Sequence, residues 1–155
     1  MNYTMNRIFT TLAALAMVFA ASCTKVNPAD ESEKLLEVNS SNLRGSWSLE
    51  TVCGESVAEG TFFYIEFDRS GDKFQIWENL TAMPSTYNHS EGTFKLYTDP
   101  ELGVYIRGID NVKQEWRDMY VIKELRRNHM VWWGKNDPSF IQTFKRVDKV
   151  PFAED

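Results

Sequence analysis

The stretch TFFYIEFDRSGDKFQIWE, residues 61–78, contains two short runs in which an apolar residue recurs at every second position. Phe63, Ile65 and Phe67 share one face of the first run, and in the second run, Lys73–Glu78, Phe74 and Ile76 lie opposite Gln75 and Trp77. Alternation with a period of two is typical of a half-buried β-strand. The short segment between the runs includes a glycine and has the length of a hairpin loop. The stretch therefore predicts a β-hairpin with one face in a core.

The same pattern continues on both sides of this hairpin. Short connections between consecutive strands favour a meander, and closing a meander into a barrel removes its exposed edges. We therefore expect an all-β fold, an eight-stranded antiparallel up-and-down barrel over residues 43–150, followed by a C-terminal tail over 151–155. The expected strands are Leu43–Cys53, Thr61–Asp68, Lys73–Glu78, Gly92–Thr98, Val104–Ile109, Trp116–Arg126, Met130–Gly134 and Ser139–Val147.

The N-terminus carries the features of an export signal. Arg7 is followed by an apolar run, Leu12–Ala21, and then by small residues directly before Cys23. This arrangement resembles a bacterial lipoprotein signal peptide over residues 1–22. The resemblance implies cleavage before Cys23 and attachment of lipid, such as palmitate, to that cysteine. The alternatives are an ordinary signal peptide cut elsewhere, with Cys23 a plain thiol, or a disulfide between Cys23 and Cys53.

A lipid anchor places the mature protein in the bacterial cell envelope. Thr24 follows the cysteine where an aspartate would favour inner-membrane retention, so we expect the outer membrane. Residues 23–42 are expected to form a lipidated tether with a short helix ending at Val38, capped by Asp30 or Ser32. Leu35 and Leu36 would be its buried side. The alternative is that this segment has no regular structure.

Charge and cysteine content narrow the possible partners. The formal net charge is −5, and removal of the signal peptide takes away Arg7 and lowers it to −6. A negative protein is a poor partner for nucleic acid, because such binding depends on neutralising phosphates. It is also not attracted to anionic lipid headgroups, so membrane attachment would rest on the lipid. With Cys23 acylated, Cys53 is expected to be a small buried apolar residue.

Gly45-Ser46-Trp47 opens the first expected strand, and Arg146 stands near the end of the last one. In these features the chain resembles a lipocalin-like domain of a bacterial lipoprotein. The resemblance implies that Trp47 plugs one end of the barrel and that Arg146 packs across it. Both residues fall at the same end of an up-and-down barrel, on strands that become neighbours when the barrel closes. The alternative is an exposed arginine in a basic Lys145-Arg146 pair.

The opposite end of the barrel is the expected ligand site. Its longest connection is Asn79–Ser90, and loops at a barrel mouth are a usual place for ligand contacts. Alternation along the strands gives a set of inward-facing residues near this mouth. For Glu78, the last residue of its strand, the alternative is a position in solvent. The resemblance implies a small, mainly apolar ligand. The expected ligand-binding residues are Phe63, Glu78, Trp116, Trp132 and Gln142.

Catalysis is not expected. His89 and His129 are the only histidines, neither has a second metal ligand at useful spacing, and no phosphate loop or nucleophile motif occurs. We therefore expect no metal site and no cofactor. The alternative function is an interaction module with a filled barrel, whose outer aromatic residues dock an envelope protein complex or a glycan. An interior cavity near ~300 Å³ would favour the ligand carrier. The outer candidates are Trp77, Tyr97, Tyr105 and Trp133.

Overall fold

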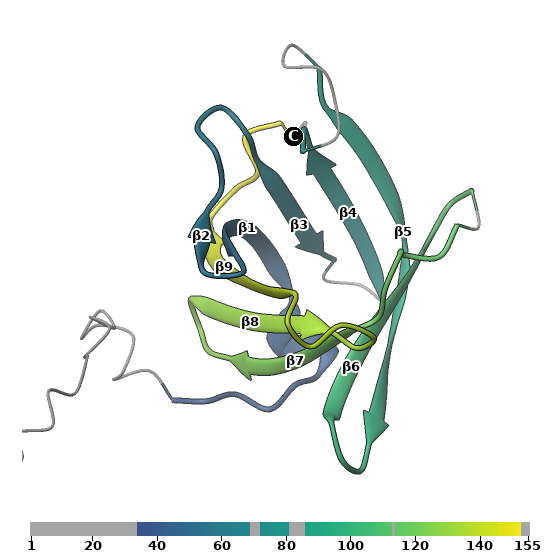
Figure 1. The fold of residues 1–155 in the computed structure, drawn as a ribbon. Helices are drawn as coiled ribbons and strands as arrows, with labels where there is room; N and C mark the ends of the chain where they lie inside the picture. Colours follow the sequence, from purple (N-terminus) through teal and green to yellow (C-terminus); the bar gives the residue numbers. More distant parts are fainter. Residues whose placement is uncertain (1–33, 69–71, 81–85, 113, 153–155) are drawn as a thin grey trace, which may run out of the picture.

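The computed structural model describes residues 34–68, 72–80, 86–112 and 114–152 of the chain (Figure 1). These residues form one short helix and a continuous antiparallel sheet that closes on itself. The expected all-β, eight-stranded antiparallel barrel is confirmed. The elements are α2 (Ser40–Leu43), β1 (Gly45–Val52), β2 (Glu55–Ser56), β3 (Phe63–Phe67), β4 (Lys73–Glu78), β5 (Asn88–Asp99), β6 (Gly103–Asp110), β7 (Tyr120–Leu125), β8 (His129–Gly134) and β9 (Ile141–Val147).

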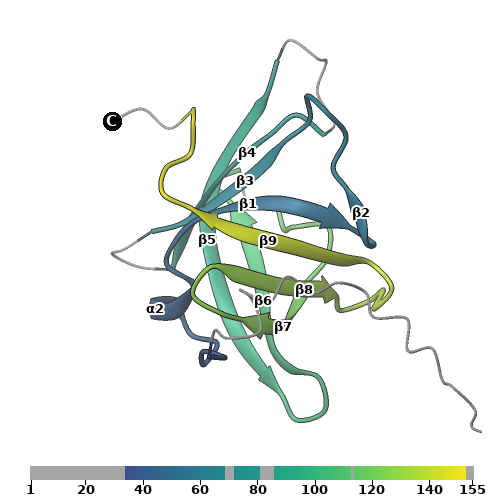
Figure 2. The same cartoon turned by 90° about the vertical axis from the view of Figure 1, so that its left-hand side faces the viewer.

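Closure comes from pairing of the first and last barrel strands. Strands β3 to β9 follow one another around the sheet, and β1 pairs with both β3 and β9. Figure 2 shows β1 and β9 side by side. The register places Trp47 opposite Arg146 on one side and opposite Ile65 on the other. β2 is only a short extension that pairs with the end of β1 and does not take part in closing the barrel.

The largest differences from the expected strand boundaries are the starts of β5 and β7. β5 begins at Asn88, so the end of the expected Asn79–Ser90 loop, Asn88–Ser90, belongs to the sheet. His89 pairs with Trp77 there and stacks on its ring at a centroid distance of 4.9 Å, which gives this polar segment an aromatic partner. β7 begins only at Tyr120. The Asp118 carboxylate before it accepts the Met119 backbone N–H, a local bond that competes with strand pairing.

The helix expected to end at Val38 is wrong for the residues that the structure describes. Residues 34–38 contain no helix, and Leu36 donates its backbone N–H to the Leu125 carbonyl at 2.8 Å. Leu35 is 58% exposed, so the two leucines do not form one buried side. The single described helix is α2, where the Asn39 side chain accepts the Asn42 N–H as an N-cap. Asp30, Ser32 and Cys23 lie outside the described residues.

Cys53 also departs from expectation, because it is exposed rather than buried. It lies in the tight turn between β1 and β2, with a φ of 52°. Its Sγ approaches the Ser139 carbonyl oxygen at 3.6 Å. The turn directs the side chain away from the barrel interior, so the cysteine takes no part in the core.

The core fills the end of the barrel at which β1 begins and β9 ends. Trp47 is fully buried there, and its indole N–H donates to the Leu43 carbonyl at 2.8 Å. This bond holds α2 against the end of the barrel, as Figure 2 shows. The buried hydrophobic cluster consists of Leu43, Trp47, Leu49, Ile65, Phe67, Phe74, Phe94, Ile106, Ile122, Leu125, Met130, Trp132 and Phe144.

Arg146 completes the closed end. Its guanidinium carbon lies 4.2 Å from the centroid of the Trp47 ring, as the resemblance implied. The guanidinium also donates to the backbone carbonyls of Asn42, Arg44 and Arg127. Gly45 makes room for it, because a Cβ at this position would lie 2.6 Å from Arg146 Nη1. A single side chain therefore joins β9, the start of β1 and the turn after β7.

Within the described residues, no helix has the length and apolar character needed to cross a bilayer.

Candidate functional site

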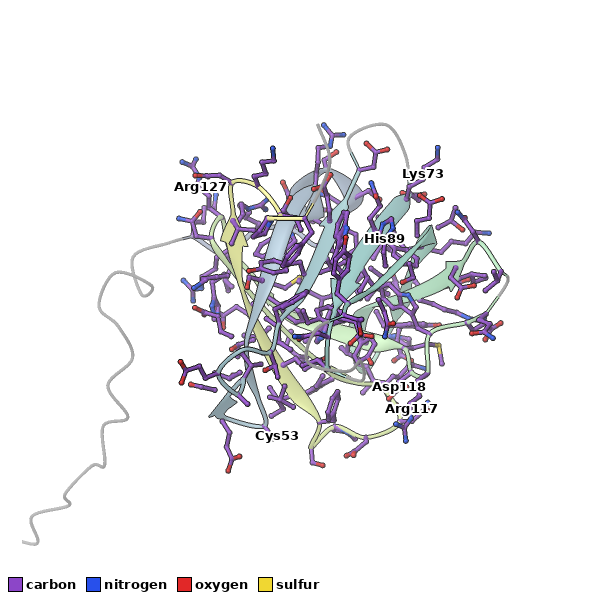
Figure 3. All side chains as sticks on the ribbon, turned by 90° about the horizontal axis from the view of Figure 1, so that it is seen from above. Cys53, Lys73, His89, Arg117, Asp118 and Arg127 are labelled. Atoms are coloured by element: carbon purple, nitrogen blue, oxygen red, sulfur yellow. The ribbon has the colours of Figure 1, made fainter. Side chains whose placement is uncertain are left out.

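The end of the barrel opposite Trp47 is formed by the last residues of four strands and the first residues of the other four. β1, β4, β6 and β8 end there, and β3, β5, β7 and β9 begin there. Figure 3 shows Arg117 and Asp118 at the same end as Cys53, and Lys73 and Arg127 at the other. This end is the mouth predicted from the strand directions.

A cavity of about 200 Å³ opens at this mouth, and its lining is mainly apolar. Its walls come from β3, β4, β7, β8 and β9 and from the segment before β7. The residues that line it are Phe63, Ile65, Ile76, Trp116, Arg117, Tyr120, Trp132 and Gln142.

Aromatic side chains that contact one another form one wall of the cavity. Tyr120 stacks on Trp132, with centroids 4.8 Å apart and planes 19° apart. Trp116 meets Tyr120 edge-on at 6.1 Å and also lies edge-on to Phe74 at 4.9 Å. Phe144 packs edge-on against Trp132 at 4.7 Å and separates the cavity from the closed end. The rings are braced by neighbours, so the cavity is largely preformed.

The position of Trp116 depends on the neighbouring strand. Its backbone N–H donates to the Gly108 carbonyl at 3.0 Å, which ties the segment before β7 to β6. The indole lies directly over Gly108, where a Cβ would overlap the ring. Glu115 forms an ion pair with Arg107 of β6, an additional tie in the same place. A residue outside the regular strands is thus held as part of the barrel wall.

Three polar side chains converge on this apolar cavity. Gln142 accepts the Trp132 indole N–H at 2.8 Å through its side-chain oxygen, which fixes the orientation of both. Burial raises the pKa of the Tyr120 hydroxyl, the Asp118 carboxylate raises it further, and the Arg117 guanidinium lowers it. The phenol is therefore neutral at physiological pH and can donate a hydrogen bond.

Arg117 differs from most charged residues of this end in having no protein partner. Among the described residues it forms no hydrogen bond or ion pair. Its neighbours, in contrast, are fixed: Trp116 by the bond to Gly108, and Met119 by its carbonyl, which accepts the Lys135 N–H at 2.7 Å. The backbone of the segment is held on both sides while the guanidinium remains available.

An adjoining cleft of about 450 Å³ shares two residues with the cavity, Arg117 and Tyr120. Its other walls come from the segment between β8 and β9. Asp118 accepts the Asn136 side-chain N–H at 2.8 Å, and Asp137 accepts both the backbone N–H and the hydroxyl of Ser139. The cleft therefore has both polar and aromatic walls, and it adjoins the apolar cavity at Arg117 and Tyr120.

Four of the five residues expected to bind ligand meet in the cavity. Phe63, Trp116, Trp132 and Gln142 all line it. Glu78 does not belong to the lining, although it pairs with Phe63 in register. Its carboxylate accepts the Asn88 side-chain N–H at 2.7 Å, which occupies it at the sheet end.

Sequence reasoning missed other residues of the cavity. Ile65 and Ile76 were assigned to the core face without a place in the site, and the structure puts both in the lining. Arg117 was missed because the segment before β7 was interpreted as strand, which puts Arg117 on the face opposite Trp116, whereas Tyr120 shares the alternation of Trp116 and was overlooked. The alternation of Trp116, Asp118 and Tyr120 gave no indication of a bend.

The outer wall is less open than expected. Trp77 is only 4% exposed and lies under the His89 ring. Tyr97 stacks on Tyr105 at 5.1 Å, Lys135 Nζ lies 4.6 Å over the Tyr105 ring, and Lys123 Nζ lies 4.4 Å over Trp133. The expected exposed aromatic surface is thus wrong for Trp77, and lysine side chains already cover two of the other rings.

A second aromatic cluster on the outer wall involves the C-terminal tail. Phe152 stacks on Phe62 at 4.6 Å and on Tyr87 at 5.1 Å, and it meets Tyr64 edge-on at 6.2 Å. The first residues of the expected tail, 151–155, therefore pack on the outside of β3. Residues 153–155 lie outside the described residues.

In the described ranges, no group of three or more His, Cys, Asp and Glu residues is placed to hold a metal ion. A polar hollow of about 270 Å³ lies over β3, β4 and β5 and includes Glu66 and Glu91. These carboxylates accept bonds from Ser46 and Asn111, respectively. The mouth cavity is the site with an apolar lining and converging polar groups.

Comparison of the chain with protein-family models, with curated proteins and with solved structures finds no match in any of the three.

Proposed function

We propose that this protein is a noncatalytic binding protein that takes up one small, mainly apolar ligand at the mouth of its barrel. The observation that carries the proposal is the cavity of about 200 Å³ with its aromatic and aliphatic lining. Small-molecule sites are typically preformed hollows of this character with a few polar groups that orient the ligand. Gln142 and Tyr120 are those groups here.

The cavity limits the size of the ligand. It is smaller than the ~300 Å³ at the lower end of ordinary ligand pockets, which was the size expected for a ligand carrier. It exceeds the ~150 Å³ of an apolar cavity that is known to accept benzene. The favoured ligand therefore has an apolar part of about one ring or a short chain, and any further group extends into the adjoining cleft.

We also propose that the chain is an envelope lipoprotein, anchored through lipid on Cys23. The support is the sequence alone, an apolar run that ends at Ala21-Ser22-Cys23. Mass spectrometry of protein extracted from membranes of its own host should find an acylated N-terminal Cys23. A soluble mature chain with a free or disulfide-bonded Cys23 would contradict the anchor, and it would leave the cavity proposal unchanged.

The alternative, an interaction module that docks a glycan or an envelope protein through the outer wall, has less support. The rings of Tyr105 and Trp133 face lysine side chains, and Trp77 is buried. A partner would have to displace these contacts. The interior cavity, in contrast, is open at the mouth.

The binding function can be tested with a neutral probe, 2-phenylethanol, measured by calorimetry and by tryptophan fluorescence. Binding should quench or shift the emission of Trp116 and Trp132, which line the cavity. Ile76→Phe would fill the cavity from β4 and should abolish binding. Ile141→Phe is the matched control, because Ile141 is 37% exposed and does not line the cavity.

Thermal unfolding of both variants would show that each is folded. Equal binding by wild type and Ile76→Phe would place the probe elsewhere and contradict the proposal. Native mass spectrometry of protein purified from its own host would then identify the natural ligand by its co-purifying mass.

A further inference from the structure

We infer that the ligand is an anion: an apolar body in the cavity with a carboxylate or similar acidic group bound by Arg117. This inference rests on the proposed binding function and adds the chemical class of the ligand. It assigns to Arg117 the role of the specificity-determining residue at the mouth.

The first argument is the state of the guanidinium. Arg117 lines both the apolar cavity and the adjoining cleft, and among the residues described it forms no hydrogen bond or ion pair. Arginine side chains present a planar set of donors that match a carboxylate in a bidentate manner. Three other arginines are engaged: Arg107 with Glu115, Arg126 with Glu124 and Arg146 with backbone carbonyls.

The second argument is the way the segment is held. The Trp116 backbone N–H donates to the Gly108 carbonyl, and the Met119 carbonyl accepts the Lys135 N–H. The Asp118 carboxylate accepts the Asn136 side-chain N–H. Residues on both sides of Arg117 are thus fixed to β6 and to the segment after β8. A side chain that starts from a fixed backbone loses less freedom when it binds, so a contact made there is stronger for the same geometry.

The third argument is the position of neighbouring acids. Asp118 and Asp137 line the cleft beside Arg117 and would repel an anion. Each of them already accepts hydrogen bonds from protein donors, Asp118 from Asn136 and Asp137 from Ser139. These neutral donors hold each carboxylate in place without cancelling its charge, so the preference for an anion depends on direct contact with Arg117. The Arg117 guanidinium has no such partner among the described residues, and Arg117 lines the cavity itself.

Tyr120 adds a second donor for the same anion. Its hydroxyl is neutral at physiological pH, because burial and then the Asp118 carboxylate raise its pKa, while the Arg117 guanidinium lowers it by less. Arg117 and Tyr120 together line both the cavity and the cleft. A ligand with its apolar end against Trp132 would present its polar end to these two side chains.

The test compares phenylacetate with 2-phenylethanol, which share the ring and differ in charge, by calorimetry at pH 7 and low salt. For wild-type protein we expect phenylacetate to bind about fivefold tighter or more, since charge-assisted bonds are stronger than neutral ones but lose strength when exposed. Arg117→Gln should remove this preference, so that phenylacetate binds the variant no tighter than 2-phenylethanol does. Arg127→Gln makes the same charge change at the opposite end of the barrel (Figure 3) and should keep the preference.

The outcomes separate the two proposals. If neither probe binds, the proposed function fails. If both bind equally to wild type, or if Arg117→Gln keeps the preference for phenylacetate, the cavity binds ligands but the anion inference is wrong. Acetate serves as a probe without an apolar body. Binding of acetate as tight as that of phenylacetate would also overturn the inference, because the apolar part would then contribute nothing.

Discussion

The guanidinium carbon of Arg146 lies 4.2 Å from the centre of the Trp47 indole, and this contact links the first and last strands of the barrel. The indole is buried beneath it and donates to the Leu43 carbonyl. The guanidinium in turn donates to the carbonyls of Asn42, Arg44 and Arg127. The pair closes one end of the barrel and leaves the cavity to the other.

Truncation at this pair should destabilise the protein unequally. Trp47→Ala removes a large side chain from a packed core and should cost about 3–5 kcal/mol in the free energy of unfolding. Arg146→Met keeps part of the packing and removes the cation–π contact, worth ~0.5–2 kcal/mol, together with its bonds to the backbone. Denaturant unfolding of both variants would measure the difference. A larger loss for Arg146→Met than for Trp47→Ala would contradict this ranking.

Gly45→Ala should be more damaging than an alanine substitution at a surface strand position. Gly45 has a φ of 112°, which residues other than glycine rarely adopt, and a new Cβ would lie 2.6 Å from Arg146 Nη1. Strain of this kind costs about 1–3 kcal/mol before any displacement of Arg146. Urea unfolding checks the loss, with Gly54→Ala as a control that shares a positive φ but has no atom within 4 Å of the added Cβ.

Cys53→Asn should stabilise the protein. Cys53 occupies a left-handed position in the turn between β1 and β2, directly before Gly54. Asn followed by Gly is the preferred pair in such two-residue hairpin turns, because asparagine tolerates positive φ better than other side chains. A gain of roughly 0.5–1 kcal/mol is expected from relieving this backbone strain. Thermal unfolding under reducing conditions would measure it, and a lower melting temperature than wild type would refute the argument.

The stability of the protein should depend on Tyr120 at alkaline pH. Burial first, and then the Asp118 carboxylate, raise the pKa of its phenol in the folded state above the ordinary value of 10.0. A raised folded pKa means that the stabilising contribution is complete below the unfolded pKa and is lost as pH rises through the folded one. The wild type should therefore lose stability above about pH 10, and Tyr120→Phe should lose less over the same range.

The same titration tests the placement of Arg117. Its guanidinium lowers the pKa of Tyr120, so Arg117→Gln should raise that pKa further. Ultraviolet difference titration of the phenolate, with Tyr120→Phe subtracted, would report the shift. An unchanged Tyr120 titration in Arg117→Gln would show that the two side chains are farther apart in solution.

The fold was predictable because a strand with one buried face and one exposed face shows a period of two in its apolar residues. Lys73–Glu78 was predicted at the boundaries that the structure has, since Phe74 and Ile76 face the interior and alternate with Lys73, Gln75 and Trp77. The start of β5 was not predictable in this way. Asn88, His89 and Ser90 are turn-type residues, and only the stacking of His89 on Trp77 shows why they continue the sheet.

The candidate site was predictable only in part, for a different reason. Phe63, Trp132 and Gln142 lie on regular strands, so alternation places them inside. Trp116 and Arg117 lie outside regular strands, and a long-range fit to Gly108 and Asn136 sets their position. Side-chain fit across different segments leaves no periodic trace in a sequence. The exposure of Cys53 was missed similarly, because a turn conformation and not the residue type directs its side chain.

The pairing of β1 with β9 has a consequence for how the chain reaches its final form. These two strands carry the most distant contacts in the sequence, and such contacts slow folding because a large loop must close before they form. Until β9 has been synthesised and has folded, the edge of β1 that pairs with it is open, and Trp47 lacks the Arg146 side chain that covers it. An open edge of this kind can pair with other chains and start aggregation. Truncated products that end before β9 should therefore accumulate as aggregates or be degraded, even though they contain every other strand of the barrel.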